Sequence, residues 1–332
     1  MTSGDDLLTP WIDQFNTASE NATTLLNNFA LAPGVGLQQM IANWSGFLQD
    51  FFNDPTSSTL TSIGSEMQQN LADVLHAYTV QDLPPSPPSD LLSEATFHTL
   101  ASGEGIYDNP HFLLPEIPQF LPPDISPAEV TPIINFLASP LSGMIMGDVG
   151  PLISPLVALG NSISAGDGLN ETLANMVGAF FNGADLNLDG LIPLIEQSGA
   201  VPFTFQNLDI AFGGLLSPGT VAAGPYNDGI AAVGGSIFNS LGVYAADVPT
   251  AGTLDLTGYG IGPLGAWEGW AETIAGLLGA PNWTEGGDVT APLTGVTLPV
   301  IPDDFLDAGA ASSAAAADLS SLVQDVVSAL GL

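Results

Sequence analysis

Residues 203–212 read Phe-Thr-Phe-Gln-Asn-Leu-Asp-Ile-Ala-Phe, and two glycines follow directly. This stretch opens a series of short apolar runs separated by glycine-rich turns, which cover residues 203–206, 208–212, 236–244 and 253–259. Short runs that are rich in aromatic and β-branched residues and bounded by turn residues are typical of strands. The sequence therefore predicts a small β-sheet within residues 201–260.

Helical periodicity dominates the sequence outside this sheet. Three stripes of apolar residues recur at three- and four-residue steps over residues 11–26, 37–52 and 60–78, and this spacing is typical of amphipathic helices. We expect the first helix to start at Thr9-Pro10, because a hydroxyl cap followed by proline is a common helix start. Similar stripes predict helices over residues 263–278 and 310–330.

Composition divides the chain of 332 residues into four regions. Residues 1–82 are predicted to be helical, and residues 83–132 form a connector that holds 11 of the 27 prolines. Residues 133–200 form an apolar helical region, and residues 201–332 hold the small glycine-rich sheet and the C-terminal helices. The expected fold class is therefore α+β, with a mostly helical N-terminal half.

Residues 133–160 are apolar enough to require a test for a membrane span. Pro140 and Gly143 interrupt the first half, and Asp148 with Gly150-Pro151 separates it from the second. Each half is shorter than the roughly 20 residues that a spanning helix needs. A buried helical hairpin is the interpretation that the sequence favours.

The charge balance excludes several classes of function. The chain has 35 Asp and Glu residues but no Lys or Arg, which gives a formal charge of −35. Nucleic-acid binding by the usual route is excluded, because neutralising phosphates requires Lys and Arg. A Schiff-base lysine and an arginine clamp are excluded too. Acidic disorder is excluded as well, because 45% of the residues are hydrophobic.

Residues that point to catalysis are scarce. The sequence has no G-x-S-x-G motif and no cysteine, and its three histidines are His76, His98 and His111. Nothing in their spacing indicates a triad or a zinc site, so we interpret them as ordinary helix and loop residues. The sequence thus predicts no enzyme, no catalytic residue and no cofactor-binding residue.

The sharpest local motif is a match to the calcium loop of EF-hands over residues 185–196. Its oxygen ligands would be the side chains of Asp185, Asn187 and Asp189, the carbonyl of Leu191 and the carboxylate of Glu196. Pro193 departs from the pattern, and no partner loop is evident. Because Asp, Asn and Gly also suit tight turns, the alternatives of a Ca²⁺ site and a plain turn both remain open.

Three blocks carry a resemblance to a known family. Residues 176–190 (Met-Val-Gly-Ala-Phe-Phe-Asn-Gly-Ala-Asp-Leu-Asn-Leu-Asp-Gly), 207–219 and 260–265 resemble the Gordonia-type outer-membrane porin A family of mycobacteria and related mycolic-acid bacteria. Members are low in basic residues and rich in Ala, Gly, Leu and Pro. The resemblance implies an exported protein of the cell envelope, and it implies no catalytic residue.

Two functional classes follow for this chain. The first is a non-enzymatic exported protein of the cell envelope or outer membrane, which forms a cation-preferring channel as an oligomer, because only carboxylates would line its lumen. The second is a soluble secreted binding protein, with calcium as a candidate ligand and no channel activity. Residues 1–6 lack the basic and apolar segments of a signal peptide, so either the protein is not exported or a signal has been trimmed from the chain. We expect trimming, because the basic segment of a signal is the one place where such a protein must carry Lys or Arg.

Overall fold

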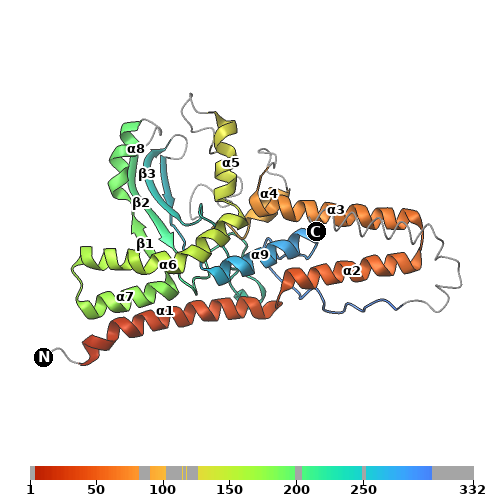
Figure 1. Cartoon of the computed structure of the whole chain (residues 1–332), viewed down its shortest axis with the longest axis horizontal. Helices are drawn as coiled ribbons and strands as arrows, with labels where there is room; N and C mark the ends of the chain where they lie inside the picture. The colour runs from red at the N-terminus through yellow and green to blue at the C-terminus, as the bar shows by residue number, and fades with distance from the viewer. Residues whose placement is uncertain are drawn as a thin grey trace.

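The computed structural model describes residues 4–81, 90–101, 114, 117, 126–198, 204–248 and 252–300. Within these residues it confirms the α+β class, with long helices around one small antiparallel sheet (Figure 1). The helices are α1 (Gly4–Leu31), α2 (Val35–Asn53), α3 (Ser57–Thr79), α4 (Asp90–Thr96), α5 (Pro127–Leu137), α6 (Pro140–Ala165), α7 (Leu169–Asn182), α8 (Ile192–Ser198) and α9 (Pro263–Leu277). The strands are β1 (Ala184–Asn187), β2 (Thr204–Phe212), β3 (Leu241–Val248) and β4 (Gly252–Leu256).

Helices α6, α7 and α1 form one layer of the molecule. α7 packs against α6 on one side and against α1 on the other, and the sheet lies on α6 (Figure 1). α9 packs between α6 and α2, and α2 and α3 extend away from the sheet as a helical pair. The helix layer therefore leaves large parts of α1, α6 and α7 free of contact with the sheet.

Of the breaks predicted within residues 133–160, the one at Pro140 is confirmed, since α5 ends at Leu137 and α6 begins at Pro140, whereas those at Gly143 and at Asp148 to Pro151 are wrong. α6 runs unbroken from Pro140 to Ala165, with Pro151 and Pro155 inside it. Small residues on one side of α6 explain the continuity: a side-chain carbon on Gly143 or Gly150 would collide with the backbone of Gly235 or Gly213. This close packing on distant backbone compensates for the two hydrogen bonds that the prolines remove.

The N-terminal helices match their predicted apolar stripes, except at the first helix start. α1 begins at Gly4, and Pro10 lies inside it. Contacts with α7 hold the helix on both sides of this proline, because Asn170 Nδ2 donates to Leu7 O at 2.8 Å and Trp11 Nε1 donates to Asn170 Oδ1 at 3.0 Å. The predicted end of the second helix, at Asp54-Pro55, agrees with α2.

The sheet is an antiparallel meander in the order β1-β2-β3-β4. The two runs predicted over residues 203–212 join into β2, with a register shift between Phe205 and Asn207. β3 begins at Leu241 rather than at residue 236, because residues 237–240 form a turn. β1 was not predicted as a strand, and it lies inside the proposed calcium loop. The helix predicted over residues 310–330 and most of the connector at 83–132 lie outside the described residues.

The core mixes residues from regions that are far apart in the sequence. One cluster joins Ala32 and Val35, at the junction of α1 and α2, to Val221, Tyr226 and Trp283. A second cluster joins the end of α3 to α4 and α5, and a third joins α6 to α9. The N-terminal helices are therefore packed on the same cores as the C-terminal residues.

Candidate functional site

Three adjacent helices expose stripes of large apolar side chains. Phe15 on α1, Leu152 on α6 and Leu169 on α7 are 72%, 71% and 77% exposed. Their neighbours follow at helical spacing on α6 and α7, whereas on α1 Ser19 and Ala22 separate two apolar groups. The apolar stripes consist of Leu8, Ile12, Phe15, Leu26 and Phe29 on α1, Ile145, Val149, Leu152, Leu156 and Ile163 on α6, and Leu169, Leu173, Val177 and Phe180 on α7.

Few charges accompany these stripes. α6 contains one carboxylate, Asp148, and α7 contains one, Glu171. In a chain with 35 acidic residues, α6 and α7 are therefore poor in charge, whereas α1 carries four carboxylates. Large exposed apolar patches are uncommon on monomeric soluble proteins and mark contact with a membrane or a partner.

Polar side chains, in contrast, occupy the contact between α1 and α7. Trp11 donates to Asn170, Gln14 Nε2 lies 3.5 Å from Asn175 Oδ1, and Asn182 Nδ2 donates to Gln14 O at 2.9 Å. The amide of Asn21 continues this ladder toward Asn182. The two helices are thus joined by amide hydrogen bonds, while their exposed apolar side chains face solvent.

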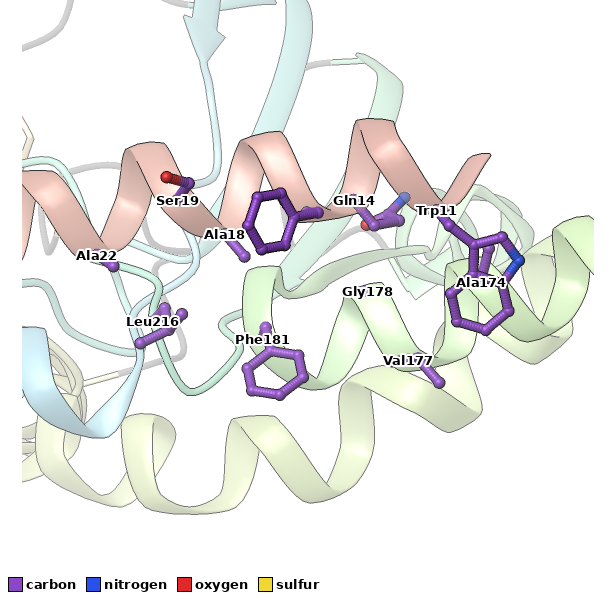
Figure 2. Close-up of a pocket in the computed structure, with 11 residues that line it drawn as sticks. Trp11, Gln14, Ala18, Ser19, Ala22, Ala174, Val177, Gly178, Phe181 and Leu216 are labelled. Carbon is purple, nitrogen blue, oxygen red and sulfur yellow. The ribbon is translucent and has the colours of Figure 1, made fainter. Parts of the chain in front are cut away.

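An open apolar groove runs along α1 and α7. Its volume is about 540 Å³, and Figure 2 shows Trp11, Ala18 and Ala22 of α1 beside it together with Val177 and Phe181 of α7. The remaining lining residues are Gln14, Phe15, Ser19, Ala174, Gly178 and Leu216. This volume lies in the range of about 300–1,000 Å³ that is usual for sites of small apolar ligands.

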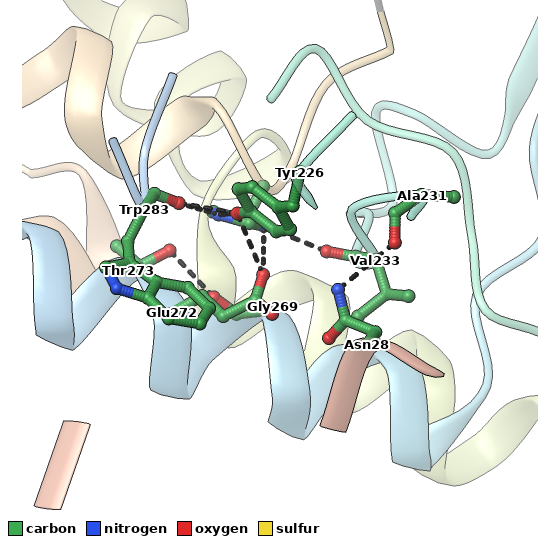
Figure 3. A network of polar contacts seen from close by, with 9 residues as sticks. Asn28, Tyr226, Ala231, Val233, Gly269, Glu272, Thr273 and Trp283 are labelled. Carbon is green, nitrogen blue, oxygen red and sulfur yellow. Dashed lines mark hydrogen bonds and ion pairs between the residues drawn. The ribbon is translucent and has the colours of Figure 1, made fainter. Parts of the chain in front are cut away.

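A buried polar cluster lies at the centre of the molecule (Figure 3). His98, which is 1% exposed, places Nδ1 2.9 Å from Val233 O and Nε2 2.7 Å from Trp283 O. The Tyr226 hydroxyl lies 2.6 Å from Trp283 O and 3.1 Å from Glu272 Oε2, and His98 Nδ1 lies 3.3 Å from the same carboxylate oxygen. These contacts connect the turn after α4, which contains His98, to α9, which contains Glu272, and to the loops that contain Tyr226 and Trp283.

Burial dominates the protonation of this cluster. It lowers the pKa of the His98 imidazole, while the hydrogen bonds to the carbonyls of Trp283 and Val233 raise it. It raises the pKa of the Glu272 carboxyl well above its ordinary value. It also raises the pKa of Tyr226, with the charge of Glu272 as the next cause. Because these groups bond to one another and to backbone carbonyls away from solvent, the cluster serves packing rather than access to a substrate.

The residues of the proposed calcium loop are placed as a strand, a turn and a short helix. Asp185 and Asn187 lie in β1, where they pair with Ala211 and Asp209 of β2. Burial, and then the charge of Asp209, raise the pKa of Asp185. Leu191 ends a 3₁₀ turn that starts at Asp189, and Glu196 lies in α8.

Asp189 has hydrogen-bond partners on both carboxylate oxygens. Asn187 Nδ2 donates to Oδ2 at 2.8 Å, and the backbone N–H of Leu208 donates to Oδ1 at 2.8 Å. These two hydrogen bonds lower its pKa. Among the described residues, no group of three or more His, Cys, Asp or Glu side chains is placed to hold a metal ion. The calcium site stays a prediction, and the geometry gives Asp189 a role in joining β1 to β2.

Sequence reasoning missed the buried cluster and the amide ladder. His98 was interpreted as an ordinary residue, because its carbonyl partners lie 135 and 185 positions away. One signal was available: Glu268 and Glu272 are the only acidic residues of α9, four positions apart in an otherwise apolar helix. Carboxylates on such a helix are rarely buried without a specific environment.

No protein-family model, curated protein or solved structure matches this chain. Among the described helices, α6 alone has the length and apolar composition to cross a membrane, and half of its most apolar window is buried inside the protein. A helix of this kind also occurs in the core of soluble proteins. The exposed apolar stripes and the groove are therefore the features of the described residues that bear on function.

Proposed function

We propose that the protein is a non-enzymatic component of the cell envelope that associates with lipid of the outer membrane through the apolar stripes of α1, α6 and α7. The observation that carries this proposal is the set of large apolar side chains that α1, α6 and α7 expose, together with the polar contact between α1 and α7. Amides bond to one another between α1 and α7, while large apolar side chains point outward. In lipid, helices associate through polar side chains and close packing, and outward apolar residues are stabilised by the acyl chains.

The scarcity of charge on α6 and α7 also supports contact of these helices with lipid. α6 and α7 carry one carboxylate each, so placing their apolar stripes in lipid displaces little charge from water. Because the chain has no Lys or Arg, attraction to anionic headgroups cannot supply the binding energy. The proposal thus predicts binding to neutral and zwitterionic lipid, driven by burial of apolar area. Membership in the outer-membrane porin A family is part of the same proposal.

Vesicle flotation tests the proposal. The wild-type protein should float with phosphatidylcholine vesicles, and the double variant Leu152→Gln/Leu156→Gln should lose most of this binding. Leu75→Gln is the matched control, because Leu75 is 56% exposed but lies on α3, outside the helix layer. Wild-type protein that stays unbound, or equal flotation of the double variant and the control, would contradict the proposal.

Channel activity, in this proposal, belongs to an assembly of several copies. The four described strands form an open sheet, so a lumen must be formed between copies. With a formal charge of −35 and no basic side chain, the lumen favours cations. Reversal potentials in planar bilayers should show this preference, and the preference should weaken at high salt; anion-selective conductance would refute it.

The groove along α1 and α7 favours a second candidate function, the binding of an apolar ligand by a secreted protein. Ala18→Phe should fill the groove without changing the apolar stripes of α6 and α7. If ligand binding is the function, this variant loses affinity for a fluorescent fatty acid and keeps its behaviour with vesicles. If lipid association is the function, vesicle binding depends on Leu152 and Leu156, whatever residue stands at position 18.

A further inference from the structure

A small pocket with unpartnered oxygen atoms lies between the end of α1 and α9. Its volume is about 170 Å³, and it is lined by Asn28, Phe29, Ala32, Gly34, Val35, Trp267, Glu268, Ala271 and Glu272. The acceptors are Asn28, Glu268 and Glu272, and the other lining residues are apolar or glycine. The pocket therefore combines a polar end with an apolar wall.

Two oxygen atoms of this pocket are buried without a hydrogen-bond partner. Asn28 is 2% exposed, and its Oδ1 has no partner. Its Nδ2 donates to Ala231 O at 3.1 Å, and Figure 3 shows the amide oxygen pointing the opposite way. Glu268 Oε2 is the second buried atom without a partner. Buried acceptors of this kind are costly unless a donor reaches them.

We propose that this pocket binds a primary alkylammonium ion. An ammonium group has three N–H donors, and two of them match the unpartnered oxygens of Asn28 and Glu268. Its alkyl part would lie against Phe29, Val35 and Trp267, and an aromatic ring beside a cation adds further attraction.

The chain itself supplies no such cation, since it lacks Lys and Arg, so the ligand must come from outside. The apolar wall and the size of the pocket exceed what a bare metal ion needs. Burial disfavours the charged form of Glu268 and raises the pKa of its carboxyl to about 7. A bound cation would lower this pKa again, because it pairs with the carboxylate. The pocket shares Phe29 with the apolar stripe of α1, but its polar end, Asn28 and Glu268, lies outside the stripes.

Titration calorimetry at pH 8 with n-butylammonium chloride tests the pocket. Glu268→Gln should weaken binding about tenfold or more, because it removes a charged acceptor. Glu66→Gln on α3 is the matched control: it removes one exposed charge elsewhere and should leave the affinity unchanged, although the whole chain attracts cations. Near-UV circular dichroism checks that both variants are folded.

Neutral 1-butanol on the wild-type protein gives a test that needs no variant. We expect no measurable binding of the alcohol. Nα-acetyl-lysine amide, which carries the same ammonium group on a lysine side chain, should bind as n-butylammonium does if the pocket also admits lysine residues of other proteins. The proposal fails if the alcohol binds as tightly as the amine. It also fails if Glu268→Gln and Glu66→Gln reduce the affinity equally.

Discussion

At the scale of single residues, His98 holds the centre of the molecule together. Replacing it with Gln removes the ring nitrogens that contact the carbonyls of Val233 and Trp283 and the carboxylate of Glu272. We expect a loss of about 3 kcal/mol in the free energy of unfolding, measured by urea denaturation. His76→Gln, on the exposed surface of α3, should change it by less than about 0.5 kcal/mol. Equal effects of the two variants would show that the cluster is unimportant.

Asp189 decides between the two interpretations of the calcium motif. Its carboxylate accepts from the Leu208 N–H and from Asn187, so Asp189→Ala should lower the melting temperature. Because these hydrogen bonds lower the pKa of Asp189, the loss should be present at pH 7 and fade as the pH falls through the lowered pKa. If residues 185–196 form only a structural turn, Asp189→Ala should lower the melting temperature equally with and without millimolar Ca²⁺. A calcium-dependent rise in melting temperature that Asp189→Ala abolishes would instead support the metal site.

At the scale of elements, α6 depends on its small residues. Gly150→Ala should destabilise the protein by about 1–3 kcal/mol, because the added carbon meets the carbonyl of Gly213. Gly160→Ala is the matched control on the same helix, since nothing lies within 4 Å of its added carbon. The control should gain up to about 1 kcal/mol from helix propensity. Urea denaturation of the two variants measures the difference, and a stabilising Gly150→Ala would contradict this packing.

The same helix shows which features the sequence allows one to predict. The end of α2 at Asp54-Pro55 follows from local rules. The continuity of α6 does not, because its prolines are compensated by the backbone near residues 213 and 235. β1 was missed for a similar reason: residues 184–187 become a strand by pairing with β2, and their acidic and amide side chains fit a loop equally well. Of the apolar stripes, only the one on α1 overlaps a predicted helix face, and that face was expected to pack against other elements, whereas Phe15 and Leu26 are exposed.

At the scale of the whole molecule, stability depends on carboxylates that have no cation to pair with. Burial raises the pKa of Glu268 to about 7 and raises that of Glu272, so the folded state binds more protons than the unfolded state below pH 7. The free energy of unfolding should therefore increase as the pH falls from 8 to 6.

Melting curves in low salt should show a rise of at least about 2 °C between pH 8 and pH 6. Below pH 6.5, the ordinary value for histidine, the lowered pKa of His98 acts in the opposite direction, so we expect a smaller gain per pH unit there. Glu268→Gln should reduce the dependence on pH, since the amide mimics the protonated carboxyl. A protein that is most stable at pH 8 would refute this account of the charge.

The central claim, that the apolar stripes contact lipid, is tested most directly by a spin label on α6. The chain has no cysteine, so Leu152→Cys can be labelled at a single site, with Glu66→Cys on α3 as the reference. With phosphatidylcholine vesicles, the label at position 152 should become more accessible to oxygen and less accessible to a water-soluble nickel chelate, while the label at position 66 should not change. If the label at position 152 stays as accessible to the nickel chelate with vesicles as without them, the claim is wrong.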